Sequence, residues 1–186
     1  MVSTRAPDPR RLDVAAFAAA GGELKGDWAA AQLRRLLSAT VESPSEASRA
    51  DVAWQVRGER LPLAGAGTHP SLSVEAETEV TLECQRCLQP MRWPLQAHRR
   101  IFFVEGEDAA AALDANHDDD VLALVPALDL QALVEDELLL ALPIVPRHEV
   151  CPDPLPRAFV EDEGAGVPED SPFAALSVLK RGPAPS

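Results

Sequence analysis

The sequence predicts an α+β fold, with an antiparallel sheet or partly closed barrel, helices packed against it and a Pro-rich C-terminal extension. The first observation is the alternation of apolar and polar residues through 72–83. Leu72, Val74 and Leu82 fall in an apolar row, whereas the opposite row is largely acidic. A strand with one solvated face is typical of antiparallel sheets, because parallel strands are usually buried on both faces.

The second observation is a strongly periodic helix at 130–142, which Asp129 can N-cap and Pro143 ends. A sheet with helices packed against it is an α+β arrangement. Before the long strand we expect a helix at 10–20, a strand at 23–28, a helix at 28–38, a strand at 51–57 and a Gly/Pro turn region at 61–70. After it we expect a return strand at 93–104, an acidic mobile loop at 105–120 and a short strand at 120–125.

The chain is predicted to divide into a core domain at 1–142 and a Pro-rich extension at 143–186. Seven prolines between Pro143 and Pro172 argue for an extended segment. Ser171 and Pro172 then open a predicted short terminal helix.

Composition limits the possible functions of this 186-residue chain. An apolar fraction of 46% can build a core, while a net charge of −13 disfavours autonomous binding to nucleic acid. No window of 18 apolar residues occurs, so no membrane contact is expected. The N-terminus lacks a secretory apolar region, and three cysteines do not resemble a secreted disulfide framework. The expected location is cytoplasmic.

Residues 84–104 form a locally basic stretch that contains no acidic residue. It is followed at once by the acidic segment 105–120, which has no Lys or Arg. The basic stretch is either a contact surface for RNA or a partner, or simply a solvated strand face. The candidate contact residues are Arg86, Arg92, Arg99 and Arg100.

The motif Cys84-x-x-Cys87 directly follows the long strand, and three interpretations compete. A redox motif is normally placed at a helix N-terminus, which this one is not. A metal site needs about four ligands, and His148 with Cys151 supplies two more. These four residues, Cys84, Cys87, His148 and Cys151, would bind one structural zinc and attach the extension to the turn. The remaining interpretation is a pair of reduced thiols that shape a tight turn.

Motifs for enzymes are missing from the sequence. It contains no G-x-S-x-G, phosphate loop, dinucleotide fingerprint or HExxH. No small-molecule substrate is therefore expected. The acidic cluster of Glu135, Asp136 and Glu137 is predicted to be a solvated helix face, because consecutive helical positions point in different directions.

Three separated segments resemble one family: Glu83–Pro90 (ECQRCLQP), Val134–Arg147 (VEDELLLALPIVPR) and Ser171–Lys180 (SPFAALSVLK). They are similar to the YceD family, the large ribosomal RNA subunit accumulation proteins. The resemblance implies a non-enzymatic factor for synthesis, processing or stability of large-subunit (23S) rRNA, with no catalytic residue. Some relatives carry a further Cys-rich cluster after the second segment, where this chain has His148 and Cys151.

The implied partners are a pre-large-subunit ribosomal particle, a basic ribosomal protein or assembly factor, and rRNA itself. The acidic segments at 105–120 and 161–170 suit a basic protein. The competing function is a zinc-dependent hydrolase that processes RNA, which would need an open metal position beside a general base.

Overall fold

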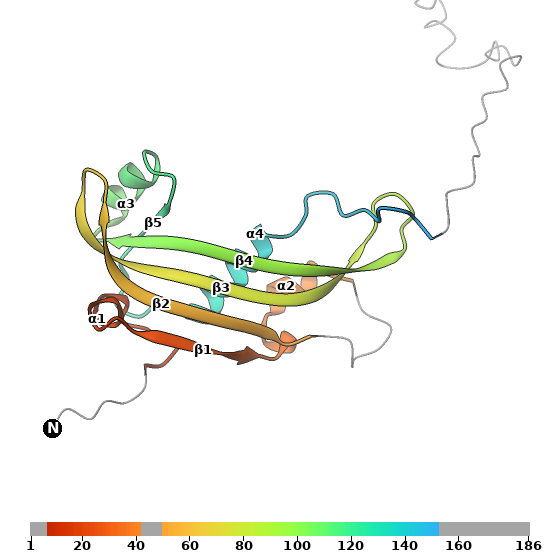
Figure 1. The fold of residues 1–186 in the computed structure, drawn as a ribbon, viewed down its shortest axis with the longest axis horizontal. Coiled ribbons are helices and arrows are strands. Elements are labelled where there is room, and N and C mark those ends of the chain that lie inside the picture. The colour runs from red at the N-terminus through yellow and green to blue at the C-terminus, as the bar shows by residue number, and fades with distance from the viewer. Residues whose placement is uncertain (1–6, 42–49, 153–186) are drawn as a thin grey trace, which may run out of the picture. The chain divides into compact units, whose positions relative to one another are not determined.

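The computed structural model describes residues 7–41 and 50–152, and their architecture is α+β. Five strands form one sheet in the order β1-β2-β3-β4-β5, as Figure 1 shows. The strands are β1 (Glu23–Trp28), β2 (Val52–Leu63), β3 (Gly67–Glu83), β4 (Pro90–Val104) and β5 (Asp120–Ala123). The helices are α1 (Val14–Ala19), α2 (Arg34–Ser38), α3 (Glu107–Asp114) and α4 (Leu130–Leu140), with a 3₁₀ turn at Ala30–Gln32. The predicted terminal helix lies outside the described residues.

Two features of the predicted sheet are corrected. The sheet is open rather than a partly closed barrel, because β1 and β5 stand at opposite ends of the strand order. It is also mixed rather than purely antiparallel, because β5 runs parallel to β4. A parallel pair needs a long crossover, usually with a helix. The segment predicted as the acidic mobile loop 105–120 provides that crossover and contains α3.

The strands are also longer than the sequence pattern suggested. The region 61–70, predicted as a turn, is mostly strand, and only the residues between Leu63 and Gly67 form the hairpin turn. Gly65 and Gly67 have φ of 74° and 91°, which places the left-handed backbone at that turn. Glycines and prolines near the turn interrupt the apolar alternation, so the ends of these strands leave no clear periodic signal.

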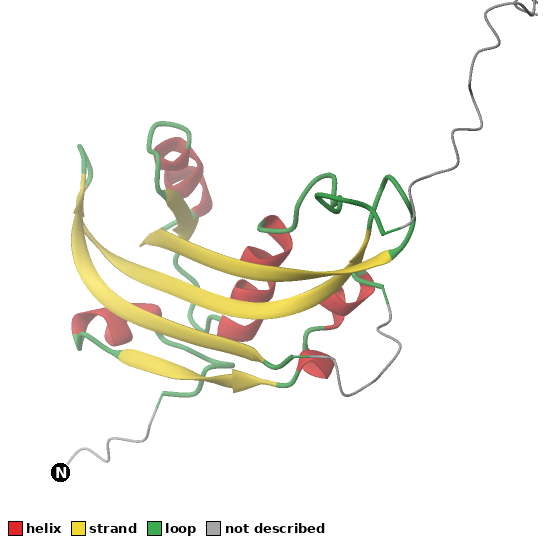
Figure 2. Cartoon of the chain, turned by 45° about the vertical axis from the view of Figure 1, so that its right-hand side comes forward, coloured by secondary structure: helices red, strands yellow, loops and turns green. Residues whose placement is uncertain are grey.

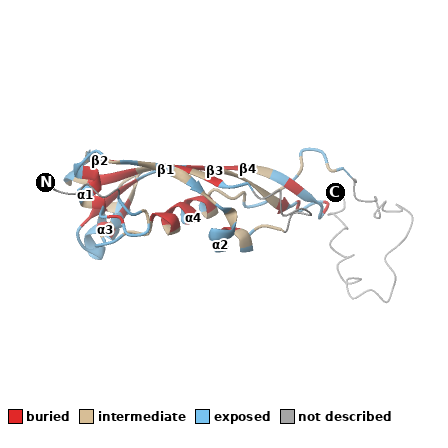
Figure 3. Ribbon diagram, turned by 90° about the horizontal axis from the view of Figure 1, so that it is seen from below, coloured by how far each residue is buried: buried red, intermediate tan, exposed pale blue. Residues whose placement is uncertain are grey.

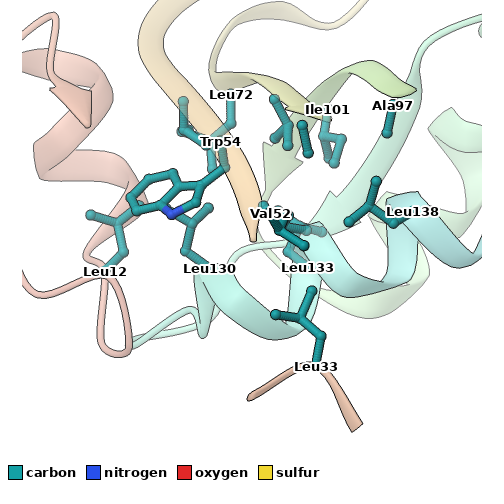
Figure 4. Close-up of a cluster of buried hydrophobic side chains, with 14 of the residues drawn as sticks. Leu12, Leu33, Val52, Trp54, Leu72, Ala97, Ile101, Leu130, Leu133 and Leu138 are labelled. Carbon is teal, nitrogen blue, oxygen red and sulfur yellow. The ribbon is translucent and has the colours of Figure 1, made fainter. Parts of the chain in front are cut away.

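The main core lies between one face of the sheet and the helices (Figure 4). Val52 and Leu72 from the sheet lie in the same cluster as Leu130, Leu133 and Leu138 from α4. Asp129 accepts hydrogen bonds from the backbone N–H groups of residues 131 and 132, so the predicted N-cap is confirmed. Figure 3 shows α4 and α2 on the same side of the long strands. A smaller cluster, which includes Phe102, Val121 and Ala110 of α3, covers one end of the opposite face.

The predicted solvated face at 135–137 is wrong for two of its three residues. Glu135 and Glu137 are only 8% and 7% exposed. Glu135 accepts hydrogen bonds from the backbone N–H groups of Arg35 (2.7 Å) and Leu36 (3.1 Å). It thereby caps the start of α2, where Leu33 has no polar side chain to do so. Charge alone does not reveal this burial, since it depends on a helix about 100 residues away.

We expect Glu135→Ala to lower the free energy of unfolding by about 1–3 kcal/mol, because one buried and one partly buried N–H group lose their acceptor. Urea unfolding measures the change. Asp136→Ala is the matched control: Asp136 also pairs with Arg35, but its side chain is half exposed, and exposed pairs contribute about 0.2–1 kcal/mol. Equal losses in the two variants would contradict the capping role.

Candidate metal centre

The turn between β3 and β4 carries Cys84 and Cys87, and we call residues 84–88 the knuckle. Cys84 donates its N–H to the Gln89 carbonyl at 3.0 Å, and Leu88 donates to the Cys84 carbonyl at 2.8 Å. Among the described residues Leu88 is the only non-glycine with a positive φ, at 60°. Such a conformation costs about 1 kcal/mol or more for a non-glycine residue, so the surrounding bonds must hold this turn in shape.

A second segment, which follows α4, reaches the knuckle. In Figures 1 and 2 the chain after α4 extends to the turn between β3 and β4. Gln85 donates its N–H to the Pro146 carbonyl at 2.9 Å. The backbone N–H of His148 points at the Cys84 sulfur, with 3.4 Å between the atoms. These contacts place Pro146 and His148 against the knuckle.

The two segments bring together all four predicted metal ligands. The ligand atoms of Cys84, Cys87, His148 and Cys151 all lie within 4.8 Å of one another. The sulfurs of Cys84 and Cys151 are 3.9 Å apart, and the Cys87 sulfur is 3.4 Å from Nδ1 of His148. A tetrahedral zinc with Zn–S of about 2.3 Å requires S–S distances of about 3.8 Å and slightly shorter S–N distances. The cluster is therefore able to hold one metal ion.

Burial and hydrogen bonds set the electrostatics of the thiols. Burial raises the pKa of the Cys84 thiol, but the N–H groups of His148, Arg86 and Cys87 outweigh it and lower that pKa to about 5. Burial raises the pKa of Cys87. Cys84 and Cys87 are buried in a small apolar cluster with Leu82 and Met91, whereas Cys151 is partly exposed. A thiolate at Cys84 is the form that a metal ion needs.

Arg86 contacts the second segment. Its Nε donates to the Cys151 sulfur at 3.1 Å, and its Nη2 donates to the carbonyls of His148 (3.1 Å) and Glu149 (3.4 Å). A zinc ion with three thiolates and a neutral imidazole carries a net charge of −1, so a guanidinium beside Cys151 would offset that charge. Arg86 is thus placed to orient the candidate ligands.

The other three candidate arginines lie apart from the cluster. Arg99 is within 3.2 Å of Glu137 and 3.3 Å of Asp120, and burial raises the pKa of Glu137 while Arg99 opposes that change. Arg92 pairs with Glu79, and Arg100 lies 3.8 Å from Asp119. The structure does not gather the four arginines into one patch, and their contact with RNA or a partner stays a prediction. The sequence alternation along β4 could have indicated that Arg99 lies on the core face of the sheet. Arg99 falls in the same row as the buried residues Ala97 and Ile101.

Among residues 7–41 and 50–152 no helix has the length and apolar character needed to cross a membrane. The fold and the cluster together define a class of small α+β proteins, in which a Cys/His cluster joins a hairpin turn to the segment after the last core helix.

Comparison with known proteins gives the particular family. A family model described as "Large ribosomal RNA subunit accumulation protein YceD" matches residues 72–180. The chain is 31% identical over 164 residues to the protein of that name from Haemophilus influenzae, covering 84% of this chain and 86% of the relative. No solved structure matches significantly. The chain belongs to the YceD family, and the predicted resemblance is confirmed.

Proposed function

We propose that this chain is a non-enzymatic, cytoplasmic factor that supports the synthesis, processing or stability of 23S rRNA. The name of its family and of its relative, which refers to accumulation of the large ribosomal RNA subunit, supports this role. The proposed partners are a pre-large-subunit particle and a basic ribosomal protein or assembly factor. The net charge of −13 favours a basic protein over bare RNA as the direct contact.

The proposed cofactor is one structural zinc held by the four clustered ligands. The single observation that carries this proposal is the convergence of three sulfurs and one imidazole nitrogen within 4.8 Å. The two pairs of ligands are 61 residues or more apart in sequence, so one ion would cross-link the knuckle to the segment after α4. The ion would thereby fix that segment in place. Burial contributes little there, because several apolar residues of the segment are exposed, including Ile144 and Val150.

The same ligand set argues against the hydrolase alternative. A catalytic zinc usually has three protein ligands and leaves the fourth position for water or substrate. Here four protein ligands would fill a tetrahedral site. The carboxylates nearest in sequence, Glu83 and Glu149, are both exposed. Glu83 lies on the strand face opposite Leu82, which packs with the thiols. The arrangement therefore favours a structural site over a general base beside an open metal position.

We expect the pure, zinc-loaded protein to leave precursor large-subunit rRNA intact, while the same gene restores 23S rRNA levels in a strain that lacks it. Gel analysis of the RNA, and the ratio of 23S to 16S rRNA in cells, measure the two effects. RNA cleavage that disappears in Cys151→Ser would instead establish the hydrolase.

The proposed arginine contact is tested in the same strain with Arg92→Ala and Arg100→Ala together. In the described part of the chain, the side chains of these two residues form ion pairs with Glu79 and Asp119 rather than with α4 or the Cys/His cluster. Weaker co-sedimentation with large-subunit precursors is expected, with a smaller dependence on salt than for the wild type, because two charged contacts are removed. Unchanged co-sedimentation would remove these residues from the interface.

A further inference from the structure

The face of the sheet turned away from α1 and α4 carries a trough of about 950 Å³. Side chains alternate along each strand, so those that point to this face form two rows across β1 to β4. The floor of the trough, between the two rows, is formed by backbone atoms. They belong to four residues that pair with one another across the strands, namely Gly26, Trp54, Ala76 and Ala97. The first row is Lys25, Gln55, Glu75 and His98, and the second is Asp27, Ala53, Glu77 and Gln96.

The described helices leave this middle part of the face uncovered. In Figure 3 the long strands run along the upper side of the molecule, with α4 and α2 beneath them. The helix α3 covers only the end of the face near Leu63 and Phe102. As far as residues 7–41 and 50–152 are concerned, the trough is therefore open to a partner along its length.

The charge of the trough is negative. Its walls hold the carboxylates of Asp27, Glu75 and Glu77 against one full cation, Lys25. His98 lies 3.8 Å from Glu75. Within the described residues, the carboxylates of Asp27 and Glu77 make no ion pair or hydrogen bond with another side chain, so both remain open to a ligand.

The register makes a specific position for a cation. Asp27 and Glu77 both pair with Ala53, one from each side. Neighbouring strands lie about 4.8 Å apart, so the two carboxylates flank a gap of about 10 Å with only a methyl group at its base. A guanidinium inserted over Ala53 can donate to both carboxylates, because its N–H groups form a planar fork.

We propose that this trough is the docking site for an extended, arginine-rich segment of a partner protein. The inference rests on the proposed function for its biological setting, since it names the basic partner and the surface that partner would contact. The alternatives fit less well. Phosphate oxygens would meet three carboxylates in the walls, and a second copy of this chain, at −13, would be repelled.

The test measures binding of a short arginine-rich peptide to the whole protein. Asp27→Asn combined with Glu77→Gln removes the two open carboxylates and keeps the side-chain sizes. Glu59→Gln combined with Glu105→Gln is the control, because it changes the net charge equally while both residues lie outside the trough. Titration calorimetry gives the affinities, and backbone amide shifts in NMR spectra locate the peptide.

We expect the trough variant to bind the peptide about five- to tenfold more weakly and the control variant to bind like wild type. Amide shifts should centre on residues 25–27, 53–55 and 75–77. Equal weakening in both variants, or shifts centred on α3, would overturn the proposal, as would a single-stranded RNA that binds in the trough more tightly than the peptide. A wild type that binds the peptide there but fails to restore 23S rRNA would instead reject the proposed function alone.

Discussion

Replacing Cys84 with Ser should abolish stoichiometric zinc binding and release the segment from Pro143 to Cys151, while the sheet stays folded. Structural zinc contributes directly to folding, with apparent binding energies of about 10–16 kcal/mol in zinc-finger peptides. Here the ion would bridge two segments at one end of the sheet, outside the main core cluster. The loss should therefore be local rather than global.

Two measurements on protein purified without an affinity metal column check this result. Elemental analysis should give one zinc per chain for the wild type and well below one for Cys84→Ser. Limited trypsin digestion should cut faster after Arg147, which is exposed in the segment held by the cluster. Far-UV circular dichroism should change little. A chelator added to the wild type should reproduce the same pattern.

The control is Glu149→Gln, in the same segment. The Glu149 side chain is not a ligand, and only its carbonyl accepts a hydrogen bond from Arg86. This variant should keep both zinc and protection from trypsin. If the wild type carries well under one zinc and Cys84→Ser is no less stable, the zinc proposal fails. The knuckle would then be a turn shaped by hydrogen bonds and reduced thiols alone.

Local patterns predicted those parts of the structure that local chemistry determines. The alternation at 72–83 correctly indicated β3, and Asp129 correctly marked the start of α4. The spacing of two cysteines on a turn, with His148 and Cys151 in the segment after α4, indicated four residues that the fold does place together. Ligand chemistry provided that signal, because a metal site demands several donors whatever the fold.

The sequence patterns could not predict which distant segments pair with one another. The parallel strand β5 is four residues long, and a run that short gives no sign of its direction. The acidic composition of 105–120 suggested a loop, yet Ala110 packs with Phe102 and Val121 and anchors α3. Glu135 was expected in solvent because its partners, two N–H groups of another helix, become visible only once α2 and α4 pack together.

Leu138→Ala is expected to cost about 2–5 kcal/mol, through lost transfer energy and the cavity that remains. Leu138 is fully buried and lies in the main cluster between α4 and the sheet. Alanine favours helix at least as well as leucine, so any loss reports packing rather than helix propensity. Leu140 provides a matched control in the same helix, since its side chain is 72% exposed.

Urea unfolding of the two variants separates packing from other effects. The midpoint for Leu138→Ala should fall with little change in the slope, whereas Leu140→Ala should stay within about 0.5 kcal/mol of wild type. An unaltered midpoint for Leu138→Ala would mean that α4 does not pack on the sheet as described. Because α4 leads directly into Pro143 and the segment that carries His148, such a result would also remove the support that brings this ligand to the knuckle.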